Sequence, residues 1–439
     1  MKLSELVDFN PSLRMPDTDR VPFVDMASLP QHSRDIISFE LRAPSSSGAR
    51  FMNGDTLIAR ITPCLENGKG AQVRILTPKQ IGQGSTEFIV MRAKHPSDRD
   101  FVYYLSRHPV FRSFAIKQMT GTSGRQRVAW QSLTDFEFKE IQLEERRAVA
   151  AVLAALDDKI ELNRRMNETL EAMARAIFRD WFVTFGPTRA KMAQRGEAPS
   201  NSKAGGEDPQ KENVARAPYL APDIWSLFPD ALDEDGKPEG WNSGTLAEVA
   251  NLNPESWSRA NYPDSVEYVD LSNTKWGTIE AITSCSNETA PSRAQRILRP
   301  GDTIVGTVRP GNGSYAYVSA EGFTGSTGFA VLRPKRSIFR EVVYLASTSG
   351  ENIDRLAHLA DGGAYPAVRP EIVSATEFVS APERLIAEFS SSTSALIDRA
   401  EANKREIETL AATRDLLLPK LMSGEVRVSD AEKIAGEVA

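Results

Sequence analysis

The sequence is poor in the residues that build disulfide or metal-bound frameworks. Its 439 residues contain two cysteines, Cys64 and Cys285, and four histidines. So few cysteines in so long a chain exclude a disulfide scaffold, and the scattered histidines offer no zinc-ligand spacing. We therefore expect no structural metal.

Long apolar runs are missing as well. Uninterrupted apolar stretches are far shorter than the ~20 residues needed to cross a bilayer, and the opening MKLSELVDFNP lacks the apolar region of a signal peptide. These absences predict a cytoplasmic protein with no membrane partner.

The common catalytic signatures are absent too. The sequence has no G-x-x-x-x-G-K-[ST] phosphate loop, no G-x-S-x-G elbow, no H-E-x-x-H zinc helix and no Asn-Pro-Pro-aromatic motif of amino-methyltransferases. Two fragments resemble a nuclease pattern, Asp235 with Lys237 and Glu137 with Lys139, but neither has the strand context or upstream Pro-Asp partner that a metal site needs. The histidines lack evident Cys or Asp partners by spacing; they are His32, His95, His108 and His358. We expect a chain without catalysis of its own.

What is present is an ordinary globular composition, with 41% hydrophobic and 26% charged residues, over a length that favours two or three domains. The net charge of −6 conceals an uneven distribution, because residues 1–140 carry 19 Lys and Arg against 15 Asp and Glu. Residues 101–134 contain no acid and several basic residues, namely Arg107, Arg112, Lys117, Arg125 and Arg127. Such a segment is either a solvated positive face or a phosphate-binding surface.

An internal repeat of about 240 residues organises the chain. The matching segments occur in the same order in both halves: LSELVDFNP (3–11) with LAEVANLNP (246–254), NGDTLIARITP (53–63) with PGDTIVGTVRP (300–310), and GSTEFIVMR (84–92) with GSTGFAVLR (325–333). The Gly-Asp pairs read as turns that lead into β-branched strands, and a long stretch without Pro or Gly follows in each half. Each half is therefore expected to be strand-rich first and helical afterwards.

The long helical stretches carry apolar stripes. The first, 144–182, would be roughly 58 Å long at 1.5 Å per residue, so it must project or pair. Positions three and four apart form a heptad seam that Thr393 and Arg414 interrupt in the second half. The seam comprises Leu156, Ile160, Asn163, Leu170, Ile177, Leu396, Asn403, Ile407, Leu410 and Leu417. We expect the two helices to pair as an antiparallel coiled coil, in which buried Asn163 and Asn403 fix the register.

These patterns predict an internally duplicated α+β protein with pseudo-twofold symmetry, in which two mixed α/β domains are each followed by a long helix. The predicted segments are a first recognition domain (1–140), a first long helix (141–185), a flexible or partly ordered connector (186–240), a second recognition domain (241–380), a second long helix (381–424) and a frayed C-terminal tail (425–439). A duplicated binding unit without catalytic apparatus and with a rigid spacer suits DNA, since paired domains read separate half-sites. Because the halves differ in sequence, their half-sites should differ.

The repeat motifs, together with IFRDWFVTFGPTRAKM, IWSLFPDAL, PEGW and the C-terminal LLLPKLMSGEV, resemble the specificity subunit of type I restriction-modification systems over nearly the whole chain. The resemblance implies two target recognition domains that read a bipartite asymmetric sequence in double-stranded DNA. It implies two modification (methyltransferase) subunits packed against the exposed faces of 144–182 and 383–422, and restriction subunits that translocate and cleave DNA. S-adenosylmethionine, ATP and Mg would then belong to those partners, with no cofactor in this chain.

The residues that contact DNA are chosen from their chemistry, because the family's recognition loops vary. Arginine and glutamine read guanine and adenine edges, while serine and backbone amides approach phosphate. The candidates in the first half are Arg60, Thr62, Lys69, Ser123, Arg125, Gln126 and Arg127, and those in the second half are Arg293, Arg296, Arg309, Asn312, Tyr315, Tyr365 and Arg369. Gly328 stands where the first half has Glu87, so the two domains need not support their loops identically.

Two other functions remain open. A non-catalytic scaffold, in which the coiled coil recruits partners and the duplicated domains bind protein, predicts behaviour insensitive to salt, whereas DNA recognition predicts strong salt dependence. A metal-dependent nuclease would need a carboxylate cluster that the sequence does not reveal.

Overall fold

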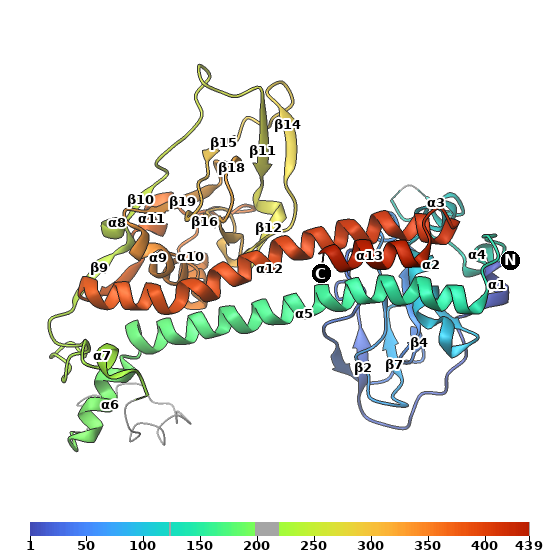
Figure 1. Ribbon diagram of the computed structural model, residues 1–439, viewed down its shortest axis with the longest axis horizontal. Coiled ribbons are helices and arrows are strands. Elements are labelled where there is room, and N and C mark those ends of the chain that lie inside the picture. Colours follow the sequence, from blue (N-terminus) through green and yellow to red (C-terminus); the bar gives the residue numbers. More distant parts are fainter. Residues whose placement is uncertain (123, 198–218, 439) are drawn as a thin grey trace. The chain divides into compact units, whose positions relative to one another are not determined.

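The computed structural model describes residues 1–122, 124–197 and 219–438, and it divides into two compact units (Figure 1). Unit 1 comprises Met1–Arg165 and Asn403–Ala439, and unit 2 comprises Met166–Ala402. The long helices α5 (Leu143–Phe182) and α12 (Glu383–Ser423) each contribute a part to both units. Among the described residues, no helix has the length and apolar character needed to cross a membrane.

Unit 1 combines short strands with helices that follow them in the chain. Besides its parts of α5 and α12, its elements are α1 (Leu3–Leu6), β1 (Val7–Phe9), β2 (Val21–Val24), β3 (Glu40–Arg42), β4 (Ala49–Phe51), β5 (Thr56–Ala59), β6 (Gly70–Gln72), β7 (Gly82–Gly84), β8 (Phe88–Ala93), η1 (Pro96–Asp98), α2 (Arg99–Arg107), α3 (Pro109–Lys117), α4 (Trp130–Leu133) and α13 (Val428–Val438). The strands form two mixed or antiparallel sheets, in the orders β1-β8-β5-β6 and β3-β2-β7-β4.

The alternation of side chains along β5 explains how unit 1 is layered. Ile58 faces a core shared with α2 and the two long helices, while Leu57 and Ala59 face a second core that includes Val24 and Phe51 of the other sheet. A strand that is apolar on both faces must be covered on both. The β1-β8-β5-β6 sheet is therefore the middle layer of the unit, between helices and the second sheet.

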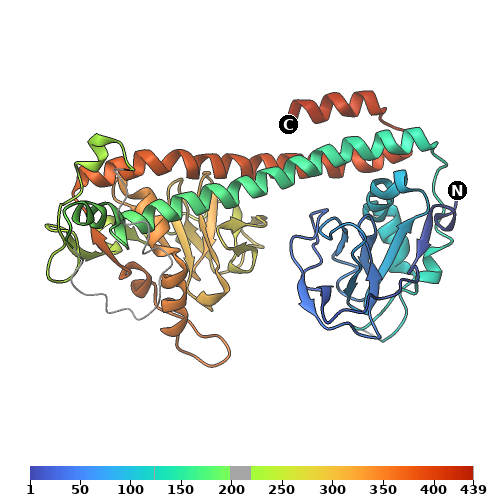
Figure 2. The ribbon, with the colours of Figure 1, turned by 90° about the horizontal axis from the view of Figure 1, so that it is seen from below.

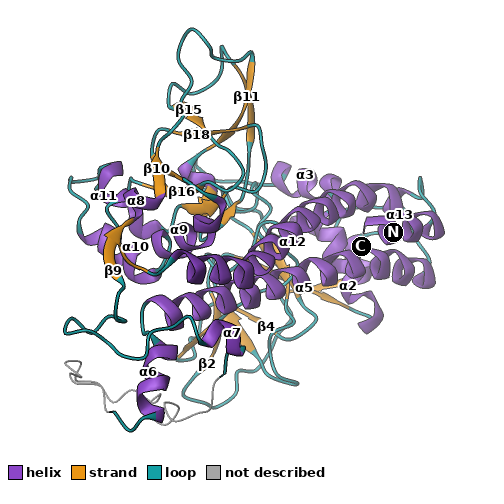
Figure 3. Cartoon of the chain, turned by 60° about the vertical axis from the view of Figure 1, so that its left-hand side comes forward, coloured by secondary structure: helices purple, strands orange, loops and turns teal. Residues whose placement is uncertain are grey.

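Unit 2 repeats this plan (Figure 3). Its elements are α6 (Gly186–Gln194), α7 (Pro222–Trp225), β9 (Asn242–Thr245), α8 (Leu246–Val249), β10 (Ala250–Leu252), β11 (Ser265–Val269), η3 (Leu271–Asn273), β12 (Thr274–Lys275), β13 (Thr278–Ile279), β14 (Thr283–Ser286), β15 (Ala294–Ile297), β16 (Thr303–Gly306), η4 (Pro310–Asn312), β17 (Tyr315–Tyr317), β18 (Phe323–Ser326), β19 (Phe329–Pro334), η5 (Ser337–Phe339), α9 (Arg340–Ser347), α10 (Gly350–His358), α11 (Pro370–Ser374) and β20 (Glu377–Ser380). Its main sheets, β10-β19-β16-β17 and β14-β11-β18-β15, have the strand orders of unit 1. In each unit the second sheet contains one parallel pair, β2 with β7 or β11 with β18.

The Gly-Asp-Thr motif has the same structural role in both units. Gly54 and Gly301 have φ values of 92° and 93°, which L side chains rarely adopt, so glycine allows the chain to turn into β5 or β16. The following Asp55 is 1% exposed and accepts two hydrogen bonds from Arg92 of the neighbouring strand, at 2.7 and 2.6 Å. Asp302 does the same with Arg333, at 2.8 and 2.9 Å. The motif thus joins a turn to a bidentate ion pair that links adjacent strands.

The helices α5 and α12 pack together within each unit. In unit 1, Asp157 of α5 lies 2.6 Å from Arg414 of α12, and Lys159 lies 3.2 Å from Glu406. In unit 2, the ring of Phe389 in α12 lies 4.9 Å from that of Phe182 in α5, centroid to centroid. Ion pairs thus join the two helices in the first half of α5, and aromatic packing joins them at its last residue.

The predicted seam residues are buried or half-buried. Six are buried, namely Leu156, Ile160, Asn163, Asn403, Leu410 and Leu417, and four are half-buried, namely Leu170, Ile177, Leu396 and Ile407. The two polar interruptions of the stripe are also buried: Thr393 donates to the carbonyl of Phe389, and Arg414 pairs with Asp157. The interruptions are thus sites of internal hydrogen bonding.

The sequence expectation about the C-terminal tail was wrong. The tail predicted to be frayed contains α13, which turns back after α12 and buries Ala431 in the core of unit 1 (Figure 2). The connector predicted to be flexible or partly ordered begins with α6 at Gly186–Gln194, and Phe228 within it is buried. Residues 198–218 of that connector lie outside the described residues.

Candidate nucleic-acid interface

The two candidate loops of unit 1 lie side by side. The amide of Thr62 donates to the carbonyl of Gln126 at 3.0 Å, and the amide of Val128 donates to the carbonyl of Arg60 at 2.9 Å. Segments more than sixty residues apart in the chain therefore form one short antiparallel bridge. We call residues 60–62 and 125–128 the first loop pair.

The same bridge exists in unit 2. The amide of Arg309 donates to the carbonyl of Pro366 at 2.7 Å, and the amide of Val368 donates to the carbonyl of Thr307 at 2.9 Å. Residues 307–309 and 365–368 form the second loop pair. The backbone frame is thus common to both units, and only the side chains on it differ.

An ion pair supports the first loop pair. Arg127 donates to both carboxylate oxygens of Glu87, with its Nη2 at 2.7 Å from Oε1 and its Nε at 3.0 Å from each oxygen. The hydrogen bond from Arg127 lowers the pKa of the Glu87 carboxyl below its usual range. The Arg127 guanidinium is therefore already bound to Glu87 of the same chain. This contact stabilises the loop and occupies hydrogen-bond donors that DNA would otherwise receive.

The second loop pair is supported differently. Gly328 and Ala367 occupy the places of Glu87 and Arg127, so the ion pair has no counterpart there. Instead, Arg309 donates to the carbonyl of Ala364 at 2.6 Å, and its guanidinium lies 4.7 Å from the centre of the exposed Tyr365 ring. A cation–π contact thus holds Arg309 and Tyr365 together.

The remaining candidates differ in how much surface they present. Arg125, Asn312 and Arg369 are exposed, and Arg293 is exposed with an ion pair to Asp270 at 2.9 Å. Ser123 lies outside the described residues. Among the second-half candidates, Arg296 is half-buried and donates to Ser256 at 3.1 Å, and burial lowers the pKa of its guanidinium.

Two candidates are directed into the protein. Tyr315 is 6% exposed and packs edge-on against Trp276, so it does not belong to the exposed surface. Lys69 is half-buried and donates to the carbonyl of Met26 at 2.7 Å, which ties the loop after β5 to an earlier segment.

Some arginines of the acid-free segment 101–134 form internal hydrogen bonds and stabilise a neighbouring loop. Arg107 donates to the carbonyls of Gly68 and Gln31, and Arg112 donates to the carbonyl of Glu66. These hydrogen bonds fix the position of the loop that follows β5. Two arginines of this segment belong to the first loop pair, and of these Arg125 is exposed while Arg127 is half-buried.

One exposed aromatic residue escaped the sequence interpretation. Trp276 is 59% exposed, has a φ of 46° and donates its amide to the carbonyl of Gly313, next to Asn312. Bases stack on such rings. The dipeptide Trp276-Gly277 was the available signal, because glycine marks turns and a large aromatic residue in a turn is seldom needed for the core.

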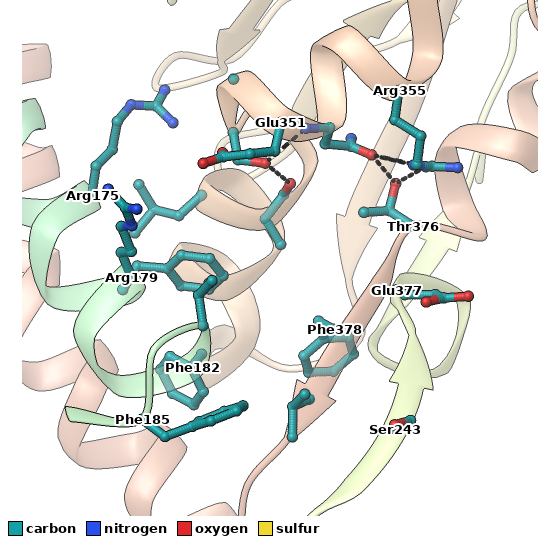
Figure 4. A pocket seen from close by; sticks show the side chains of 18 residues that line it. Arg175, Arg179, Phe182, Phe185, Ser243, Glu351, Arg355, Thr376, Glu377 and Phe378 are labelled. Atoms are coloured by element: carbon teal, nitrogen blue, oxygen red, sulfur yellow. Dashed lines mark hydrogen bonds between the residues drawn. The ribbon is translucent and has the colours of Figure 1, made fainter. Parts of the chain in front are cut away.

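A cavity of about 660 Å³ in unit 2 is lined by residues outside the second loop pair (Figure 4). Phe178, Phe182 and Phe378 give it an apolar lining, and Arg355 at its edge is held by Asn352 and Thr376, each at 3.0 Å. None of the candidate DNA residues that the structure describes lines it. Thr376 also donates to the Asn352 side chain at 3.2 Å, so these three polar groups bond to one another.

No model of a known protein family matches the chain. The chain is 24% identical over 330 residues to the specificity subunit of the type I restriction enzyme HindI from Haemophilus influenzae, covering 68% of this chain and 71% of that protein. It is 23% identical to the MjaIX specificity subunit from Methanocaldococcus jannaschii, covering 75% of this chain and 70% of that protein.

Its fold is similar to the crystal structure of the type I restriction-modification S subunit from M. genitalium, with a TM-score of 0.52 and 13% identity over 96% of this chain and 95% of that one. The sequence matches and the duplicated fold agree with the resemblance that the repeat motifs carry. The chain is thus similar to type I restriction-modification specificity subunits, in sequence over about 70% of its length and in fold over nearly all of it.

Proposed function

We propose that this chain is the DNA-recognition subunit of a type I restriction-modification complex, and that it reads a bipartite, asymmetric target without catalysing a reaction. The observation that carries the proposal is the pair of loop bridges: one backbone frame occurs twice, with different side chains on it. A repeated frame with varied side chains suits two half-sites of different sequence.

Each loop pair, together with the residues next to it, would read bases with polar side chains. Arg125 and Gln126 in unit 1, and Asn312 in unit 2, have the donors and acceptors that recognise base edges in the major groove. Trp276 adds an aromatic face beside Asn312. The supporting contacts, Glu87 with Arg127 and Arg309 with Tyr365, would set the angle at which each loop meets DNA.

The long helices would form the spacer. The proposal includes antiparallel pairing of α5 and α12 as a coiled coil with pseudo-twofold symmetry. The contacts within the units support it, because early residues of α5 meet late residues of α12 and the reverse holds in unit 2. The outer faces of α5 and α12 would then bind two modification subunits, and restriction subunits would join that assembly. S-adenosylmethionine, ATP and Mg would be bound by those partners.

The test maps methylated bases across a genome after co-expression with the modification subunit. In one variant, residues 120–127 are exchanged for those of a homologue, and in a matched variant residues 361–369 are exchanged. Each exchange should alter one half of a bipartite motif and leave the other half unchanged. An unchanged motif in an intact complex would refute DNA reading by these loops and favour the protein-binding scaffold.

A further inference from the structure

A cationic cavity of about 350 Å³ lies in unit 1 next to the first loop pair. Asn10 and Ser12 after β1, Arg50 of β4, Arg60 after β5 and Thr86 before β8 provide its polar lining. Among the described residues, the lining holds two arginines and no carboxylate. A cavity with this charge favours an anionic ligand.

Arg60 is the central residue of this site. Its backbone forms the bridge of the first loop pair, and its Nε is buried without a hydrogen-bond partner among the described residues. The charge of Glu87 does act on Arg60, but the Glu87 carboxylate accepts three hydrogen bonds from Arg127. A buried guanidinium nitrogen without a partner is costly, and an oxyanion would supply the missing acceptor.

The other polar groups leave donors available. Arg50 uses Nη1 for the carbonyl of Leu13, at 2.8 Å, which fixes the side chain at the cavity wall. The Asn10 side-chain oxygen accepts from the amide of Val90 at 2.9 Å, so its NH₂ group carries the remaining donors. Hydroxyl groups of Ser12 and Thr86 complete a set of groups that can all donate to one oxyanion.

The corresponding positions in unit 2 do not repeat the arginine pair, although Arg296 stands at the place of the lining residue Ala49. Thr307 replaces Arg60, because its backbone amide donates a hydrogen bond to the Gly328 carbonyl as that of Arg60 does to the Glu87 carbonyl. The Thr307 hydroxyl donates to the same Gly328 carbonyl at 2.8 Å. Ile297 of β15 replaces Arg50 of β4. The cationic pair is therefore a property of unit 1.

Resting on the DNA-recognition function proposed above, we infer that this cavity binds a phosphate group of the DNA backbone beside the half-site read by unit 1. Arg60 and Arg50 thus position the duplex and do not read its sequence, because phosphate contacts fix register and carry no base information. Free inorganic phosphate offers the same oxyanion chemistry and is the other possible source of the ligand.

The test uses the full-length chain in complex with its modification subunits. DNA affinity is measured at several salt concentrations for wild type, R60Q, R50Q and the control R427Q, which removes an arginine whose side chain is 82% exposed at the start of α13. R60Q and R50Q should each weaken binding to all sequences alike and reduce the slope of log K against log salt by about 1, while the methylated motif stays the same. R427Q should leave the slope unchanged, and R60K should restore that of R60Q.

Each other outcome has a defined meaning. An unchanged salt slope in R60Q and R50Q, with specific DNA binding by wild type, overturns the phosphate site and leaves the proposed function intact. A changed motif in R60Q makes Arg60 a base-reading residue and overturns the inference in the same way. Inorganic phosphate binding to the chain that R60Q abolishes, without any change in the salt slope, assigns the cavity to the free anion. Absence of specific DNA binding by the wild-type complex refutes the proposed function itself.

Discussion

The buried ion pair between α5 and α12 in unit 1 yields a sharp prediction about stability. The Asp157 side chain is 2% exposed and accepts hydrogen bonds from Arg414 at 2.6 Å and from the Tyr104 hydroxyl at 2.7 Å. Removing one partner of such a pair leaves a buried charge unpaired and costs about 3–5 kcal/mol. We expect R414L to lower the free energy of unfolding of unit 1 by this amount.

The reverse substitution should cost less. The Arg414 side chain, 7% exposed, also pairs with Asp415 at 2.8 Å, so D157L leaves the guanidinium one anionic partner. R414L leaves Asp157 with the neutral Tyr104 hydroxyl. The double variant D157L/R414L should recover part of the loss, because an apolar pair of similar volume is often neutral or stabilising relative to a buried ion pair, while the buried Tyr104 hydroxyl loses its acceptor.

The assay is thermal and denaturant unfolding of the four chains, arranged as a double-mutant cycle. For a folding unit of about 200 residues, a loss of about 3–5 kcal/mol lowers Tm by roughly 6–20 °C. Equal, small losses in both single variants would refute the reasoning, as would a double variant less stable than R414L. The first result would mean that water reaches the pair, and the second that the apolar replacements do not pack.

Three further predictions concern the turns, the loop support and the response to pH. Gly54 and Gly301 share a φ near 92°, but an added Cβ would lie 2.5 Å from Arg99 Cδ at the first site and 3.8 Å from Arg340 Cδ at the second. G301A should therefore lower the free energy of unfolding by about 1–2 kcal/mol from backbone strain alone, and G54A should lower it more. Denaturant unfolding of both variants measures the two losses. E87Q should loosen Arg127 and relax the methylated motif in the half read by unit 1 only, so an equal change in both halves on genome-wide mapping would contradict the role of this ion pair. Hydrogen bonds from Arg299 and Arg333 lower the pKa of Glu255 to about 2, so its contribution to stability is present above the unfolded pKa of ~4.3 and is lost as pH falls toward 2. E255Q should flatten the acid side of the stability profile over that window, and high salt should reduce the difference from wild type, because Glu255 is partly exposed.

The sequence interpretation located the loops but not the direction of every side chain on them. The repeat placed Arg60 in a duplicated motif and the acid-free segment contained Arg127, yet their partners, Glu87 and the residues of the cavity, come from distant segments. Arg107 and Arg112 read as a basic surface because they lie in an acid-free segment. They donate inward to carbonyls that only the folded chain brings near them.

The sequence was enough to predict those features that depend on residues close together in the chain. The duplication, the Gly-Asp turns into β5 and β16, and the apolar stripe of the long helices were all determined by residue order, because backbone conformation and amphipathic periodicity are properties of short segments. The C-terminal helix α13 was missed because its apolar residues are few and gain burial only against the core of unit 1.

The tertiary structure alone decided which polar groups are internal. Arg414 interrupts an apolar stripe in the sequence. It is buried in unit 1 because the fold places Asp157 beside it, and Asp157 accepts hydrogen bonds from both Arg414 and Tyr104. Tyr315 and Arg125 are equally plausible contacts in sequence, but one is buried beside Trp276 and the other is exposed on the first loop pair. The reason is physical: a charged or hydrogen-bonding side chain takes its role from the acceptor or donor it meets, and in this chain those partners are supplied by residues far away in sequence.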